Sequence, residues 1–282
     1  MTSCLLVKKN NSVKNKLFKT ALKLAGNKGL SQTFVGKILK EYGIQNCRTN
    51  QIVVNGYTMI LDKDDVMQLS LFPYEPTETN LVKQHVKELD IVVDVGANIG
   101  YYTLLLAQLK AQVYSFEPEP HNFELLKKNV ELNHFSNVTF YNKAVSNING
   151  KAKLVLADYG TGQHKLGDSK FGTKTIDIEV TTLNLDKIDF AKIDVEGAEL
   201  LALKGMKVLP FKMIVEFNTE NLKEHGSTPD EFFDFVRNYS IKQILTVGHE
   251  QQRAPDCPPP WLPPARRALP QPPRRPAHFR LW

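Results

Sequence analysis

The middle of the chain alternates short apolar stretches with longer amphipathic ones. The strand-like stretches are IVVDV (91–95), QVYSF (112–116), NVTFY (137–141), FAKID (190–194) and MIVEF (213–217). The helix-like stretches are YYTLLLAQL (101–109), HNFELLKKNVELN (121–133), GAELLALKGM (197–206) and PDEFFDFVRNY (229–239). This alternation, from Ile91 to about Val247, predicts an α/β domain with an open, doubly wound and mostly parallel sheet of the Rossmann-like type. Between the third and fourth strands, AVSNINGKAKLVLADYG and KTIDIEVTTL predict extra strands instead of a crossover helix.

The segments before this pattern have a different character. In VKNKLFKTALKLA (13–25), apolar residues form one helical stripe opposite lysines, which predicts an amphipathic helix. We expect this helix to dock on the domain, and weak contact with an anionic membrane surface is the alternative. QIVVNGYTMIL (51–61) has an Asn-Gly turn between apolar runs and predicts short strands.

The end of the chain is proline-rich. It holds ten of the sixteen prolines, six arginines and no lysine, a composition that cannot form the interior of a helix or sheet. We therefore divide the chain into a basic extension (1–49), the α/β domain (50–248) and a disordered Pro/Arg-rich tail (249–282). Whether the tail is functional or an unrelated extension is left open.

Charge and cysteine content narrow the class of protein. The net charge is +6, but the tail and the first 42 residues carry the positive charge, and 43–250 is mildly acidic. A nucleic-acid enzyme would place basic residues around its motifs, so no nucleic-acid partner is expected. The three cysteines lie far apart, which predicts neither a disulfide framework nor a metal site. Without a secretory signal or an apolar run long enough for a bilayer, the expected location is cytoplasmic.

The candidate functional residues cluster where the first two predicted strands end. Asp94 ends the first strand, and the turn Gly96-Ala97-Asn98-Ile99-Gly100 leads into a helix. Two glycines let the backbone approach a ligand closely. Glu117 ends the second strand, where folds of this type place an acid on ribose hydroxyls. The site is therefore predicted to bind a cofactor that contains ribose.

Two ribose-containing cofactors fit this description. A dinucleotide favours the turn G-x-G-x-x-G, but here Tyr102 and Thr103 follow Gly100, so the third glycine is missing. Asp94 is unfavourable beside a pyrophosphate and suits an amine. S-adenosylmethionine offers an ammonium group and a ribose without a phosphate, and it is the preferred cofactor. The alternatives are an NAD-dependent oxidoreductase and a non-catalytic cofactor-binding module.

Four blocks, in order and spacing, resemble the FkbM-type S-adenosylmethionine-dependent methyltransferases. They are VVDVGANIGYYTLLLA, VYSFEPEPHNFELLKKNVELN, NKAVSNINGKAKL and DFAKIDVEGAELLALKGM, with YEPTET and GTGQH also similar. The resemblance covers about 50–247. It implies a seven-stranded methyltransferase sheet whose last strand is antiparallel, and methyl transfer to a hydroxyl of a sugar, glycan or natural product. A small-molecule or glycan acceptor is thus the expected partner, and the oligomeric state is not predicted.

The resemblance also assigns roles in cofactor binding. It implies that the methionine moiety is surrounded by Asp94, Gly96, Asn98 and Gly100, the ribose is bound by Glu117, the adenine is held near Asn142 and Ala144, and a lid is formed by Tyr74, Glu75 and Glu78.

Methylation of a hydroxyl also requires that its proton be removed, which indicates a general base. The candidates are His164, Asp194, Glu196 and Glu216. The three carboxylates follow the fourth and fifth strands. His164 is ranked first because it lies in a glycine-rich loop that resembles the family and titrates near neutral pH.

Overall fold

The computed structural model describes residues 50–62, 73–156, 164–166, 174–237, 246–248 and 278–281, with the single residues 20, 67 and 69. The amphipathic helix expected over 13–25 lies outside these residues, apart from Thr20. In the described part of the chain, every helix is too short or too polar to cross a bilayer.

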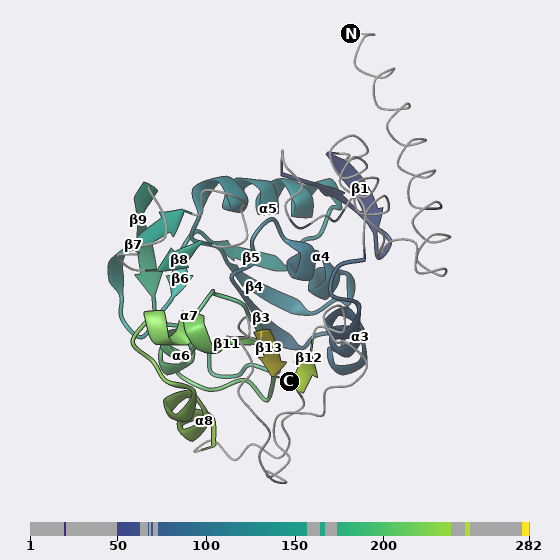
Figure 1. Ribbon diagram of the computed structural model, residues 1–282. Helices are drawn as coiled ribbons and strands as arrows, with labels where there is room; N and C mark the ends of the chain where they lie inside the picture. The colour runs from purple at the N-terminus through teal and green to yellow at the C-terminus, as the bar shows by residue number, and fades with distance from the viewer. Residues whose placement is uncertain are drawn as a thin grey trace.

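The centre of the fold is a seven-stranded sheet (Figure 1). In spatial order its strands are β12 (Thr246–Gly248), β13 (His278–Leu281), β11 (Lys212–Asn218), β10 (Phe190–Ile193), β3 (Ile91–Val95), β4 (Gln112–Phe116) and β5 (Val138–Tyr141). Strands β11, β10, β3, β4 and β5 pair in parallel, and β13 is antiparallel to both of its neighbours. The predicted doubly wound sheet with an antiparallel last strand is confirmed.

The last strand comes from an unexpected part of the chain. β13 lies in the segment 249–282, for which the composition predicted disorder over its whole length. That expectation is wrong for 278–281, which pair with Val215–Asn218 of β11 on one side and with β12 on the other. Backbone hydrogen bonding to two neighbours can stabilise a strand whatever the composition of the segment before it. The end of the chain therefore contributes to the sheet.

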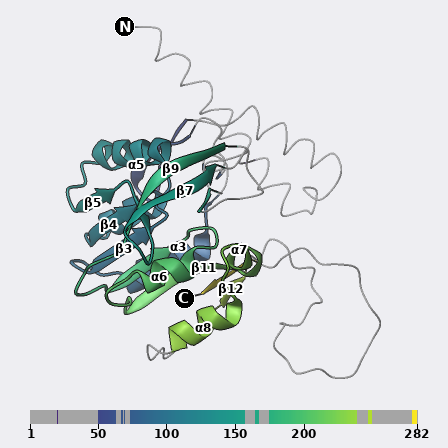
Figure 2. The ribbon, with the colours of Figure 1, turned by 90° about the vertical axis from the view of Figure 1, so that its left-hand side faces the viewer.

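Helices cover both faces of the central sheet (Figures 1 and 2). Alternate residues of β3 point to opposite faces, so Val92 belongs to one hydrophobic core and Val93 to the other. The first core is formed with α3 (Pro76–His85), α4 (Tyr101–Gln108), α5 (Pro120–Leu132), β1 (Gln51–Val54) and β2 (Tyr57–Ile60). The second is formed with α6 (Glu199–Lys204), α7 (Thr219–Glu224) and α8 (Pro229–Arg237).

A second, smaller sheet follows β5 in the chain. Its spatial order is β6 (Ala144–Val145), β9 (Lys174–Thr181), β7 (Gly150–Leu156) and β8 (Lys165–Leu166). β7 pairs antiparallel with β9 along its whole length. The extra strands predicted between the third and fourth strands of the main sheet are thus confirmed.

Candidate cofactor and acceptor site

A pocket lies at the carboxyl ends of β3, β4 and β10, the edge where open α/β sheets bind ligands. Its lining residues are Val95, Gly96, Asn98, Phe116, Glu117, Pro118, Ala144, Val145, Leu154, His164, Leu166, Asp194, Val195 and Glu196. Leu154 and Leu166 belong to the smaller sheet, which therefore closes one side of the pocket. The predicted site residues outside this lining are Asp94, Gly100, Asn142, Tyr74, Glu75, Glu78 and Glu216.

Glu117 is the most completely enclosed carboxylate of the lining. The residue is 5% exposed, and its two oxygens accept hydrogen bonds from the backbone N–H groups of Asn98 (2.7 Å) and Glu119 (2.9 Å). Burial raises its pKa from 4.5 to about 7, against the lowering effect of those two N–H groups. A buried carboxylate held in this way is suited to accept hydrogen bonds from uncharged hydroxyls.

The turn after β3 packs closely against the segment after β10 and against α5. Gly96 has a φ of 82°, and a Cβ there would lie 1.9 Å from the backbone oxygen of Asp194. Gly100 has a φ of 98°, and a Cβ there would lie 2.7 Å from Leu126 Cδ1 on α5. Both glycines therefore permit close contacts within the protein, and Gly96 also lines the pocket, where its expected role beside a ligand stays a prediction.

Asp94 lies deeper than expected. It is 1% exposed, and its Oδ2 accepts a 2.6 Å hydrogen bond from Thr103 Oγ1, which is 2.8 Å from Ser115 Oγ. Burial raises the pKa of Asp94 to about 6. In this position Asp94 ties β3 to α4 and reaches the pocket only through the turn that follows it.

The residues expected around the adenine have different positions. Ala144 is buried and lines the pocket. Asn142 does not line it, and its side-chain amide donates to the backbone oxygens of Glu117 (2.8 Å) and Pro118 (3.1 Å). Asn142 thus supports the backbone segment that carries the ribose candidate.

The expected lid packs against α4. Glu75 begins α3 with a φ of 42°, and its Oε2 accepts a 2.6 Å hydrogen bond from the Tyr102 hydroxyl. The Tyr101 hydroxyl donates to the backbone oxygen of Tyr74 (3.2 Å). Glu78 is buried on α3. These contacts join the segment to the helix that begins at the cofactor turn, outside the pocket lining.

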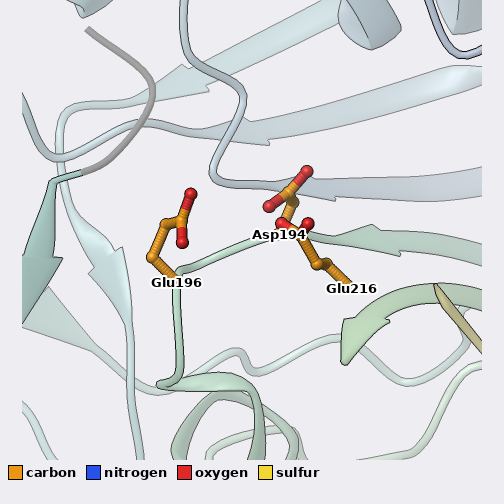
Figure 3. A group of neighbouring side chains, drawn as sticks. All are labelled: Asp194, Glu196 and Glu216. Carbon is orange, nitrogen blue, oxygen red and sulfur yellow. The ribbon is translucent and has the colours of Figure 1, made fainter. Parts of the chain in front are cut away.

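Three carboxylates meet at the ends of β10 and β11 (Figure 3). One oxygen each of Asp194, Glu196 and Glu216 lies within 4.8 Å of the others. Asp194 and Glu196 also line the pocket. Carboxylates this close can bind a hard cation or a ligand that donates protons, although the sequence predicted no metal site. The structure thus brings together all three acidic candidates for the general base.

Lys192 supplies positive charge to this group. Its ammonium lies 2.7 Å from Asp194 Oδ2, and its side chain is 1% exposed. The same nitrogen lies 5.1 Å from the centre of the Tyr102 ring, an additional favourable contact for a buried cation. Lys192 therefore offsets part of the negative charge from inside the sheet.

His164 lines the pocket just before β8. It is partly buried, and burial lowers its pKa while Glu119 acts in the opposite direction. At neutral pH the imidazole is therefore mainly neutral and able to accept a proton.

Sequence reasoning missed the residues that support the carboxylates. Lys192 was visible as a single charge in the buried strand FAKI, and this exception to the apolar pattern was the available signal. Asn221 on α7 donates a 2.8 Å hydrogen bond to Glu196 Oε2, and Glu199 accepts one of 2.9 Å from the Gly197 N–H. Neither residue has a sequence signal of its own, because its partner is known only from the fold.

The strand order, the antiparallel β13 and the pocket at the carboxyl ends of the strands define an open, doubly wound sheet of the methyltransferase type. The Methyltransferase FkbM domain matches residues 94–243. The chain belongs to this FkbM methyltransferase family.

Individual proteins are similar to the chain over part of its length. Methyltransferase sdnD of Sordaria araneosa is 28% identical over 193 residues, which is 52% of this chain and 74% of that protein. Hexuronic acid methyltransferase AglP of Haloferax volcanii is 28% identical over 162 residues, 54% of this chain and 66% of that protein. A solved structure, P. horikoshii TYW2 in complex with MeSAdo, has 18% identity and a TM-score of 0.46, over 82% of this chain and 69% of that one.

Proposed function

We propose that the protein is an S-adenosylmethionine-dependent methyltransferase that methylates a hydroxyl of a sugar, glycan or natural product. The observation that carries the proposal is the buried Glu117 in the pocket of a chain of the FkbM family. The hexuronic acid methyltransferase among the similar proteins supports a carbohydrate acceptor.

The residues of the pocket fit this cofactor better than a dinucleotide. Among the residues that the structure describes, the lining contains three carboxylates, Glu117, Asp194 and Glu196, and no lysine or arginine. A pyrophosphate would be repelled by such a wall, whereas a cofactor with a sulfonium and a ribose would be attracted. In our proposal Glu117 accepts hydrogen bonds from the ribose hydroxyls.

The bound cofactor would supply an activated methyl group. The protein must then align the acceptor and remove its proton, and alignment alone contributes up to roughly 7–11 kcal/mol in well-oriented reactions. We propose the neutral imidazole of His164 as the general base, because it lines the pocket and burial lowers its pKa. Asp194, Glu196 and Glu216 are the alternatives.

Titration calorimetry with S-adenosylhomocysteine tests the cofactor site. Glu117→Ala should weaken binding about 10- to 150-fold, since a hydrogen bond to a charged group contributes roughly 1.5–3 kcal/mol. Glu117→Gln should lose less. Glu124→Gln, an exposed carboxylate on α5, is the matched control and should bind normally. Unchanged affinity in Glu117→Ala would remove Glu117 from the site, and binding without turnover on any acceptor would indicate a non-catalytic module.

A further inference from the structure

Helix α7 contacts the loop that carries Glu196. Asn221 Nδ2 donates a 2.8 Å hydrogen bond to Glu196 Oε2, and Asn221 is 8% exposed. Glu196 lines the pocket, whereas Asn221 does not. Asn221 can therefore affect the pocket only indirectly, through its hydrogen bond to the Glu196 carboxylate.

The backbone of the loop is fitted to the same helix. Glu196 has a φ of 52° and Gly197 a φ of 109°. A Cβ at Gly197 would lie 2.4 Å from the backbone oxygen of Asn221, so this approach requires glycine. The left-handed conformation of Glu196 costs free energy and persists only where surrounding contacts maintain it. The contact with α7 provides such support on both sides of the Glu196–Gly197 peptide.

The beginning of α7 is itself fixed to β11. Asn218 ends that strand, and its side-chain oxygen accepts hydrogen bonds from the backbone N–H groups of Glu220 (3.0 Å) and Asn221 (3.2 Å). Glu216 lies two residues earlier on the same strand. One continuous segment thus carries Glu216 on β11 and holds Glu196 in the loop after β10, and this explains why the two carboxylates meet.

We propose that Asn221 is a positioning residue that holds the Glu196 carboxylate close to the positively charged sulfonium end of the methyl donor. This inference rests on the proposed function, because the sulfonium belongs to the proposed donor. Whether the Glu196 carboxylate contacts the donor beside its sulfonium or contacts the acceptor hydroxyl, it lies within several ångströms of the sulfonium. Its charge favours the positively charged donor over the uncharged thioether product. Asn221 fixes the distance over which that attraction acts.

The test is the ratio of affinities for S-adenosylmethionine and S-adenosylhomocysteine, measured by calorimetry without an acceptor. Glu196→Gln should lower the preference for the charged ligand about tenfold, the scale of one charge at this range in a partly buried site. Asn221→Ala should lower it several-fold. The double variant should equal Glu196→Gln alone, because Asn221 acts through that carboxylate. Lys223→Ala, exposed on the same helix, is the control and should keep the wild-type ratio.

Asn221→Asp provides a second variant of the same size. At pH 8 the introduced carboxylate cannot donate and repels Glu196, so the ratio should be at least as low as in Asn221→Ala. At pH 5 the introduced carboxyl, whose pKa should be raised by burial and by the adjacent Glu196, is partly protonated and can donate again, so the ratio should move toward the wild-type ratio at pH 5. Protonation of Glu117 in this range should weaken both ligands equally and cancel in the ratio.

Two results would overturn the positioning role. One is an unchanged ratio in both Asn221 variants, and the other is an Asn221→Ala effect that persists at full size in the Glu196→Gln background. Failure of wild-type protein to bind either ligand would be a different result, because it would refute the proposed function itself.

Discussion

The two halves of the pocket hold their carboxylates in different ways. At the ends of β3 and β4, Glu117 is 5% exposed and receives backbone N–H groups on both oxygens. At the ends of β10 and β11, Asp194 and Glu196 are partly exposed, and they receive the side chains of Lys192 and Asn221. Backbone donors have a fixed geometry, whereas side-chain donors can be exchanged by mutation.

This difference indicates a division of labour. A single carboxylate with fixed oxygens suits the recognition of hydroxyl groups that are the same in every reaction cycle. Three carboxylates within 4.8 Å collect negative charge where a positive or proton-donating group is expected. Glu117 should therefore determine the affinity for the cofactor. The three carboxylates at β10 and β11 should determine how strongly the site prefers a positively charged ligand.

The largest effect should come from His164, which lines the same pocket as the acidic half. His164→Ala should lower turnover about 10²–10⁴-fold with little change in cofactor affinity, the usual contribution of a positioned base. The assay needs an acceptor, which can be sought by screening extracts with labelled S-adenosylmethionine. His121→Ala, exposed on α5, is the control. Intact turnover would transfer the role to one of the three carboxylates.

The contact between the two halves can be broken at Gly96. Gly96→Asn should destabilise the fold by about 1–3 kcal/mol, because the added Cβ overlaps the backbone oxygen of Asp194. Gly226→Asn is the matched control, since Gly226 also has a positive φ (73°) but has no neighbour within 4 Å of a Cβ. Comparing the melting temperatures of both variants distinguishes the effect of the contact with Asp194 from the effect of the positive φ, which both positions share. Equal melting temperatures would contradict the proposed close approach.

The pH dependence should distinguish the halves further. Because the pKa of Glu117 is about 7 in the free protein, affinity for S-adenosylhomocysteine should rise with pH between 6 and 8, by at most about tenfold per unit. Glu117→Gln should flatten this profile. The stability of the unliganded protein depends on pH in the opposite direction. Because folding raises the pKa of Glu117 from 4.5 to about 7, stability should fall as pH increases between these two values. A flat wild-type binding profile would contradict the role of Glu117.

The smallest effect is expected from β13, which pairs with β11 behind the acidic half. Arg280→Pro removes a backbone N–H from the strand opposite Glu216 and should lower stability by about 1 kcal/mol. Arg280→Ala keeps the backbone N–H and is the control. Chemical denaturation compares the two, and identical unfolding free energies would mean that this pairing does not contribute to stability.

Local patterns predicted most of the fold. The order of apolar and amphipathic stretches predicted the parallel sheet, and it also predicted the position of Glu117 directly after β4, where this residue lines the pocket. Gly96 was selected for close approach to a ligand, and sequence could not show that the backbone of Asp194 also lies against it. Asn221 was missed because its hydrogen bond to Glu196 spans 25 residues and depends on how α7 packs. Contacts between distant segments were the part beyond prediction.

The position of β13 has a consequence for biosynthesis. The strand lies between β11 and β12, yet it is translated after both of them. Until residues 278–281 leave the ribosome, β11 lacks the neighbour that it has in the finished sheet and presents an open edge behind the acidic carboxylates. Open edges can pair with strands of other chains. A premature stop shortly before 278 should therefore yield a protein with most of its sequence and an increased tendency to aggregate.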